Sequence, residues 1–169
     1  LANSQVFAGE NNIFITSGVQ QALALLASIP FPNQKRNILI EQPTYHLLLK
    51  YLEVHQLPVI GIERTSQGID LEKLERLFRT EDIKFFYTMP RFHNPLGSSY
   101  SEKAKKSIVR LAEMYGVYIV EDDFLGDLEG NKKADPLYAY DVSSRVIYLK
   151  SFSKIIFPGL RVGVAVLPD

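Results

Sequence analysis

A lysine near the end of the chain has the surroundings that amine chemistry requires. Lys154 closes the segment Ser151-Phe152-Ser153-Lys154, and the segment Pro158-Gly159-Leu160-Arg161 follows it closely. A lysine between two apolar stretches, near hydroxyl groups and a cation, is placed to act as a free amine and attack a carbonyl carbon. The alternative is an ordinary solvated loop lysine, because most lysines lie in such positions.

Three other segments place polar or aromatic residues directly after an apolar run. They are Thr16-Ser17-Gly18-Val19-Gln20-Gln21, Glu41-Gln42-Pro43-Thr44-Tyr45 and Phe92-His93-Asn94-Pro95-Leu96-Gly97. The first is a small-residue turn whose backbone N–H groups and helix dipole could hold a phosphate, although a simple helix cap also explains it. Tyr45 could stack on a flat heterocycle, and Asn94 could present its amide to a ligand oxygen. An ordinary tyrosine and an Asx-turn are the simpler interpretations.

Three consecutive carboxylates, Glu121-Asp122-Asp123, end another apolar run. Neighbouring carboxylates in a strand point to opposite faces, and the three histidines (His46, His55 and His93) show no ligand spacing, so no metal site is expected. A contact between one of these carboxylates and a cationic ring nitrogen is a better explanation than a metal site. It would keep a pyridinium protonated and the ring an effective electron sink.

These segments can form one site only in a fold that brings the ends of several strands close together. Short β-branched and aromatic runs predict strands, and apolar residues at three and four residue spacing predict helices. Strands are expected at 12–16, 37–41, 58–62, 84–89, 117–121 and 146–150, and helices at 20–28, 45–54, 71–79 and 101–115. The alternation favours a three-layer α/β/α fold with a mainly parallel sheet, whose ligands bind at the carboxyl ends of the strands. Residues 161–167 suit an antiparallel strand, and 129–141 an exposed loop.

Composition limits the possible classes of protein. The chain has 169 residues, 46% hydrophobic and 22% charged, which suits one globular domain. Nineteen basic residues balance nineteen acidic ones, so no net charge draws the chain to nucleic acid or to an anionic membrane. Cysteine is absent, which excludes disulfides and thiolate metal sites. No membrane span or signal peptide is recognisable, so a cytoplasmic location is expected.

Taken together and in order, the motifs resemble those of fold type I aminotransferases of class I/II. They are Ser17-Gly18-Val19-Gln20, Pro43-Thr44-Tyr45, Asn94-Pro95-Leu96-Gly97, Glu121-Asp122-Asp123 and the two segments around Lys154. The resemblance covers nearly the whole chain and looks closest to the aminotransferase-like domains of MocR-type regulators of the GntR group. It implies the aspartate aminotransferase-like large domain of a pyridoxal-phosphate-dependent transferase.

The resemblance also implies a cofactor, pyridoxal 5'-phosphate (PLP), and a role for each matching residue. Lys154 would carry PLP as a Schiff base and shuttle a proton. Asp122 would pair with the pyridine nitrogen, Asn94 would bind the ring hydroxyl oxygen, and Tyr45 would stack on the ring. The phosphate would be held by the turn at Gly18, Val19 and Gln20, by Ser151 and by Arg161, with Ser153 beside them.

Two departures from the family pattern affect function. Phe124 and Leu125 stand where the family places a tyrosine that donates to the ring hydroxyl, so cofactor binding is expected to be better supported than turnover. The substrate-carboxylate arginine of the family lies in a small C-terminal domain beyond Asp169. Residues 1–169 are therefore expected to be a PLP-binding large domain, a fragment without the N-terminal segment and the small domain.

Two functions share all of these cofactor residues. One is the effector-sensing part of a GntR/MocR-type transcriptional regulator, which binds an amino acid or amine and contacts nucleic acid only through a module outside this chain. The other is the large domain of an amino acid aminotransferase. A nucleotide-binding domain is a weaker alternative, because residues 16–20 lack the glycine spacing of such loops. The resemblance implies a homodimer in either case.

Overall fold

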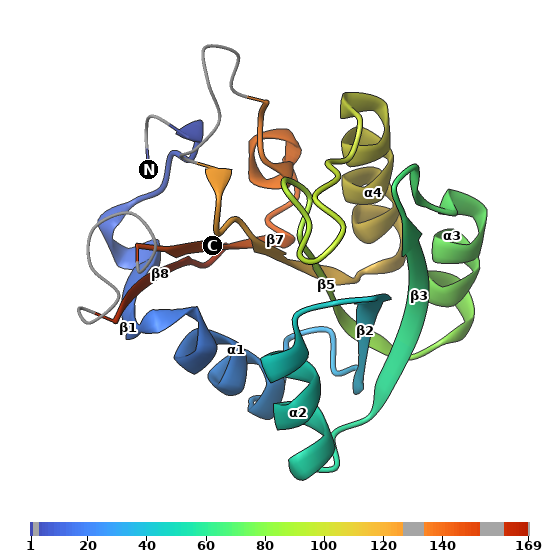
Figure 1. Ribbon diagram of the computed structural model, residues 1–169, viewed down its shortest axis with the longest axis horizontal. Coiled ribbons are helices and arrows are strands. Elements are labelled where there is room, and N and C mark those ends of the chain that lie inside the picture. Colours follow the sequence, from blue (N-terminus) through green and yellow to red (C-terminus); the bar gives the residue numbers. More distant parts are fainter. Residues whose placement is uncertain (2–3, 127–133, 153–160, 169) are drawn as a thin grey trace.

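The protein is built on an eight-stranded sheet, seen in a computed structural model that describes residues 1, 4–126, 134–152 and 161–168 (Figure 1). The strands are β1 (Ile13–Ser17), β2 (Asn37–Gln42), β3 (Val59–Thr65), β4 (Gly68–Ile69), β5 (Ile83–Thr88), β6 (Tyr118–Asp122), β7 (Val146–Ser151) and β8 (Val162–Val166). Their order in the sheet is β1-β8-β7-β6-β5-β2-β3-β4. All six predicted strand regions and the final run therefore lie in one sheet.

The sheet is mixed, as predicted. The neighbours β7, β6, β5, β2 and β3 pair in parallel, so their carboxyl ends share one edge. The last strand, β8, runs antiparallel to both β1 and β7, which confirms the interpretation of the final run. Only the short β4, paired antiparallel with β3, was not predicted, because two residues are too few to show alternation.

Helices cover both faces of the sheet, which confirms the three-layer α/β/α prediction (Figure 1). The described helices are α1 (Gly18–Ser28), α2 (His46–Val54), α3 (Leu71–Thr80) and α4 (Glu102–Tyr115), with short 3-10 helices η2 (Glu10–Asn12) and η4 (Leu137–Tyr140). One buried cluster joins α1 and α2 to one face, and a second joins α3 and α4 to the other. In the described part of the chain, none of the helices is long and apolar enough to cross a membrane.

Local signals explain where α3 and α4 begin and where α4 ends. The side chain of Asp70 accepts hydrogen bonds from the N–H groups of Glu72 and Lys73, and Ser101 accepts one from Ala104, as expected for N-cap residues. Helix α4 ends at Gly116, whose φ of 63° is the left-handed conformation that glycine adopts most easily. The capped helices then bury their apolar faces against the sheet.

The prediction of an exposed loop over 129–141 is wrong for its described part. Residues 137–140 form η4, and Leu137 is fully buried in the cluster under α4. The reason lies in Glu121, whose carboxylate accepts the N–H groups of Leu137 and Tyr138 at 2.9 Å each. This long-range bonding holds a polar segment against the core.

Candidate functional site

One cavity of about 160 Å³ gathers the predicted site residues at the carboxyl edge of the parallel strands. The predicted residues that line it are Gly18, Val19, Gln20, Tyr45, Asn94, Asp122, Ser151 and Arg161. Met89 and Phe124 complete its described wall. The two other predicted residues, Ser153 and Lys154, lie outside the residues that the structure describes. The structure thus brings together every predicted site residue that it describes.

The β1–α1 junction brings backbone N–H groups to this cavity. Gly18 opens α1 with a φ of 76°, and Ser17 makes no side-chain cap to the helix. The simple cap considered from the sequence is therefore not what the described residues form. The first N–H groups of a helix lack intrahelical acceptors, so this turn has the donors and the dipole that an anion needs.

The neighbouring strand β8 comes close to the same turn. A Cβ atom at Gly163 would lie 2.6 Å from the carbonyl carbon of Gly18 and 2.8 Å from the nitrogen of Val19. Only glycine at position 163 permits this approach without a shift of the backbone. The approach carries β8 and Arg161, which precedes it, to the start of α1.

A cation, an amide and a phenol meet at the mouth of the cavity. The Arg161 guanidinium lies against Gly18, since a Cβ atom added there would be 2.9 Å from Nη2 of Arg161. The same Nη2 is 3.5 Å from Oε1 of Gln20, and Nε2 of Gln20 donates to the Tyr45 hydroxyl at 2.8 Å. Gln20 therefore links the guanidinium to the aromatic ring.

The three consecutive carboxylates have three different surroundings. Asp122 lines the cavity, is only 5% exposed, and accepts a hydrogen bond from the Tyr87 hydroxyl at 2.7 Å. Burial and then the Asp122 charge raise the pKa of Tyr87 well above its usual value, so Tyr87 remains a donor. Asp123 instead binds Arg91 and Tyr148. Within the described residues, no group of three or more His, Asp or Glu side chains is arranged to hold a metal ion.

Glu121 should make stability depend on pH. Burial, and then the Asp123 charge, raise its pKa to about 7 from the usual 4.5. The folded state then holds the proton more tightly than the unfolded state, so the free energy of unfolding should fall as pH rises between these values. The expected slope is about 1.4 kcal/mol per pH unit.

Urea unfolding at several pH values would measure this slope in the wild type and in Glu121→Gln, which cannot lose the proton. We expect the decline to be flatter in Glu121→Gln, because every other titrating group is common to both proteins. Equal slopes would contradict the assignment of the titration to Glu121.

Sequence reasoning missed one residue of the cavity wall, Met89, and one residue that supports the wall, Tyr87. Met89 directly follows β5, so the rule that strand ends carry ligands would have found it. Phe124 lines the cavity at one of the two positions where the resemblance leads us to expect a tyrosine, whereas Leu125 is not among the lining residues. Tyr87 has no sequence signal, because its contact with Asp122 joins residues 35 positions apart.

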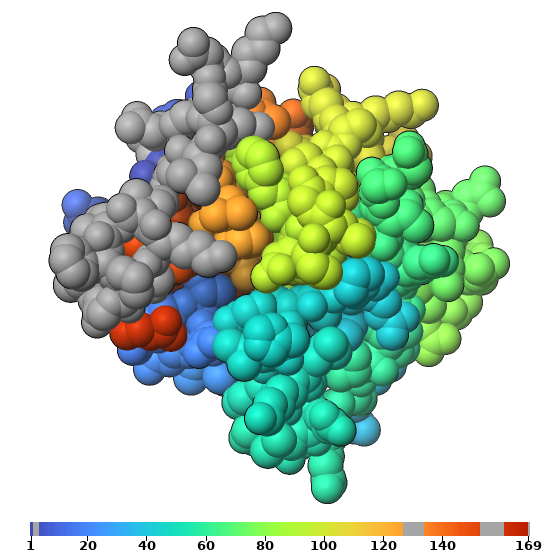
Figure 2. All heavy atoms as spheres, in the orientation of Figure 1, coloured from blue at the N-terminus to red at the C-terminus, as the bar shows by residue number. Residues whose placement is uncertain are grey.

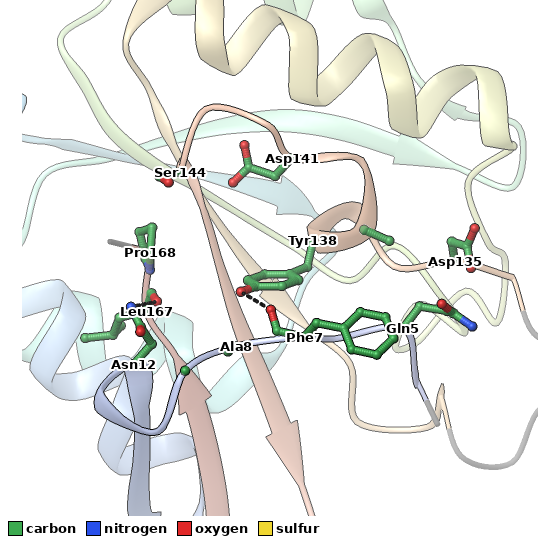
Figure 3. A pocket seen from close by; sticks show the side chains of 12 residues that line it. Gln5, Phe7, Ala8, Asn12, Asp135, Tyr138, Asp141, Ser144, Leu167 and Pro168 are labelled. Carbon is green, nitrogen blue, oxygen red and sulfur yellow. Dashed lines mark hydrogen bonds between the residues drawn. The ribbon is translucent and has the colours of Figure 1, made fainter. Parts of the chain in front are cut away.

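A larger cavity, of about 450 Å³, lies elsewhere, between the N-terminal segment, η4 and the residues after β8 (Figure 3). There the Tyr138 hydroxyl donates to the Phe7 carbonyl oxygen at 3.3 Å. Asp141 reaches this cavity, but its carboxylate accepts hydrogen bonds from Ser143, Arg145 and Val146, which follow it closely in the chain. None of the predicted site residues lines this cavity, so it does not bear on their chemistry.

Comparison with known proteins places these motifs in a family. Residues 3–169 match the family "Aminotransferase class I and II". The chain belongs to this family. It is 70% identical, over its whole length, to an uncharacterized HTH-type transcriptional regulator, YcxD, of Bacillus subtilis. It is 37% identical over 90% of its length to aromatic-amino-acid aminotransferase 1 of Thermococcus litoralis. In both cases the chain spans 38% of the length of the relative.

Solved structures agree with this assignment. The α-aminoadipate aminotransferase LysN of Thermus thermophilus, complexed with N-(5'-phosphopyridoxyl)-L-leucine, is similar with a TM-score of 0.84 and 32% identity. The match covers 92% of this chain and 41% of LysN. The fold is therefore that of the PLP-dependent aminotransferases, as the resemblance implied.

Proposed function

We propose that this chain binds pyridoxal 5'-phosphate and is the effector-sensing part of a GntR/MocR-type transcriptional regulator. The observation that carries the proposal is the single cavity lined by Gly18, Tyr45, Asn94, Asp122, Arg161 and three further predicted residues. The 70% identical relative is named as an HTH-type regulator, which supports regulation over metabolism. A cytoplasmic homodimer that meets nucleic acid through a module outside this chain belongs to the same proposal.

The phosphate end of the cavity fits the cofactor. A phosphate needs several donors and a cation within reach of one point. The α1 turn supplies backbone N–H groups, and Arg161 lies against Gly18, where a Cβ atom would come within 2.9 Å of the guanidinium. Ser151 contributes its hydroxyl from the end of β7. Val19 and Gln20 would donate their backbone N–H groups.

The ring end fits as well. Asp122 is a buried acceptor whose position is fixed by Tyr87, and its carboxylate would hold a proton on the ring nitrogen. Asn94 would donate to the ring hydroxyl oxygen, and Tyr45 would cover one ring face. When bound, the cofactor supplies an electron sink for an attached amine, while these residues orient it and keep water away. Lys154, with Ser153 beside it, is the amine that we assign to carry the cofactor.

The second candidate function is amino group transfer between an amino acid and a 2-oxo acid. The relative from Thermococcus litoralis is named as an aminotransferase, which favours this alternative. Phe124 argues for binding over turnover, because its ring brings no hydroxyl donor to the cavity wall. In both cases the ligand would be an amino acid or amine.

Chemical labelling tests the proposal. The full-length protein is mixed with pyridoxal phosphate, reduced with borohydride, and mapped by mass spectrometry. We expect the label on Lys154 and its complete loss in Lys154→Ala. Lys150→Arg is the matched control: Nζ of Lys150 donates to Ser4, away from the cavity, so the label on Lys154 should persist.

Label found on other lysines at equal yield, or none on the full-length protein, would overturn the cofactor assignment. Once Lys154 is labelled, two further measurements separate the functions. An amine-dependent change in DNA binding without turnover supports the regulator, and steady conversion of an amino acid with a 2-oxo acid supports the enzyme.

A further inference from the structure

The turn that carries Asn94 is closed by its own backbone and by one imidazole. The N–H of His93 donates to the Ser98 carbonyl at 2.9 Å, and the N–H of Gly97 donates to the His93 carbonyl at 2.5 Å. The N–H of Leu96 points to Nδ1 of His93 at 3.4 Å. Figure 2 shows the segment after β5 (yellow-green) at the surface, against the segment after β2 (cyan). His93 itself is buried, so the turn is held by contacts in the interior of the protein.

The anchor is Glu41, a fully buried carboxylate at the end of β2. It accepts hydrogen bonds from Arg64 at 2.6 Å, from Thr88 at 2.7 Å, and from the Tyr100 hydroxyl. The N–H of Met89, a residue of the cavity wall, also donates to it, at 3.2 Å. Burial alone would raise the pKa of Glu41, but the contact with His93 and the Arg64 charge outweigh it and lower the pKa. Glu41 therefore stays charged.

The contact between Glu41 and the turn is the imidazole of His93. Its Nε2 lies 3.1 Å from Oε2 of Glu41, and neither side chain is exposed. Because Nδ1 faces the N–H of Leu96, Nδ1 is the acceptor and we assign the ring proton to Nε2, toward Glu41. The imidazole ring thus joins the carboxylate to the turn.

Glu41 also forms a buried ion pair with Arg64, and Arg64 holds the opposite end of the turn. Nη2 of Arg64 donates to the carbonyl oxygen of Ser98 at 3.4 Å, and the guanidinium lies 3.7 Å from the centre of the Tyr100 ring. A buried ion pair generally contributes little net stability compared with apolar residues of the same volume. What this pair does provide is fixed geometry, because Glu41 holds the turn at His93 and Arg64 holds it at Ser98.

We infer that Glu41 and His93 are positioning residues for Asn94, fixing the turn that presents its amide to the cofactor ring. The assignment of Asn94 to the ring rests on the proposed function, whereas the anchoring of the turn does not. Neither residue lines the cavity, so each acts through the turn. Loosening the turn at His93 should therefore cost cofactor affinity only while Asn94 is present.

A double-mutant cycle in the full-length protein tests the inference. PLP affinity is measured for the wild type, His93→Leu, Asn94→Ala and the double variant. We expect His93→Leu to weaken PLP binding by about 10-fold when Asn94 is present. In the Asn94→Ala background the same substitution should weaken binding by less than about 2-fold. Equal losses in both backgrounds would mean that His93 acts only through general stability, and the inference would be wrong.

Hydrogen exchange of the cofactor-free protein gives an independent measurement. The peptide spanning residues 90–100 should exchange about 10-fold faster in His93→Leu and in Glu41→Gln. Lys84→Met is the matched control: it also removes a buried polar contact of β5, from Nζ to the Ala27 carbonyl, but far from the turn. Its exchange in residues 90–100 should match the wild type.

The two measurements keep the proposals apart. If the wild type does not bind PLP, the proposed function fails and exchange alone decides the anchoring. Unchanged exchange of residues 90–100 in both His93→Leu and Glu41→Gln would overturn the anchoring of the turn, and faster exchange would support it. If Glu41→Gln does not fold, His93→Leu still decides, because Arg64, Thr88 and Met89 continue to satisfy Glu41.

Discussion

Replacing Gly163 with alanine should destabilise the fold and weaken cofactor binding together. The new Cβ atom would lie 2.6 Å from the Gly18 carbonyl carbon and 2.8 Å from the Val19 nitrogen. Both neighbours are backbone atoms, so no rotamer change can relieve the contact, and β8 and α1 must move apart. We expect a loss of about 3 kcal/mol in the free energy of unfolding. Because the Val19 nitrogen is one of the proposed phosphate donors, PLP affinity should fall by about 10-fold or more.

Gly116→Ala is the matched control for this substitution. Unlike Gly163, Gly116 has a positive φ, 63°, but a Cβ atom added there would meet nothing within 4 Å. The control should cost about 1 kcal/mol from backbone strain alone and leave PLP affinity unchanged. Urea unfolding and PLP titration measure both quantities. A Gly163→Ala protein as stable as Gly116→Ala would show that β8 and α1 tolerate separation and that the close approach is not required.

Most of the fold could be predicted because its signals are local. The central strands are short, apolar and β-branched, and the helices between them show clear spacing. The interpretation of the last run as antiparallel followed from the short loop before it, since a parallel crossover needs a dozen residues or more. The 3-10 helix at residues 137–140 could not be predicted, because it depends on backbone bonds to Glu121, 16 and 17 residues earlier.

The same distinction explains what the sequence revealed of the site. Asp122, Asn94 and Tyr45 were found because each follows a strand, and parallel strands end at one edge. Glu41 also ends a strand, yet only Tyr45 was singled out from its segment. The role of Glu41 depends on hydrogen-bond donors from residues 64, 88, 89 and 100, which no spacing in the sequence brings together. Long-range polar networks are therefore the part of a site that a single sequence does not disclose.

The neighbouring carboxylates Asp122 and Asp123 should respond in opposite ways to the same substitution. Asp122→Asn keeps the size of the side chain and an oxygen that can accept from Tyr87, so stability should change little. The charge facing the proposed ring nitrogen is lost. Since charge-assisted hydrogen bonds contribute about 1.5–3 kcal/mol, PLP affinity should fall by about 10- to 100-fold.

Asp123→Asn should instead act on stability. It removes the charge that compensates the buried Arg91 guanidinium, whose pKa is raised above its usual value because the attraction of Asp123 exceeds the effect of burial. Breaking a buried pair in this way costs about 3–5 kcal/mol. Asp123 does not line the cavity, so PLP affinity of the folded protein should change much less than in Asp122→Asn.

Thermal unfolding and PLP titration at a temperature where both variants are folded would measure this contrast. The comparison is informative because the two residues are adjacent, equally charged and similarly buried, so burial or charge alone cannot produce opposite results. The extended backbone can produce opposite results, since successive side chains point to opposite faces of a sheet. If Asp123→Asn weakened cofactor binding and Asp122→Asn did not, the carboxylate assigned to the ring nitrogen would be the wrong one, and the orientation of the ring in the cavity would have to be reversed.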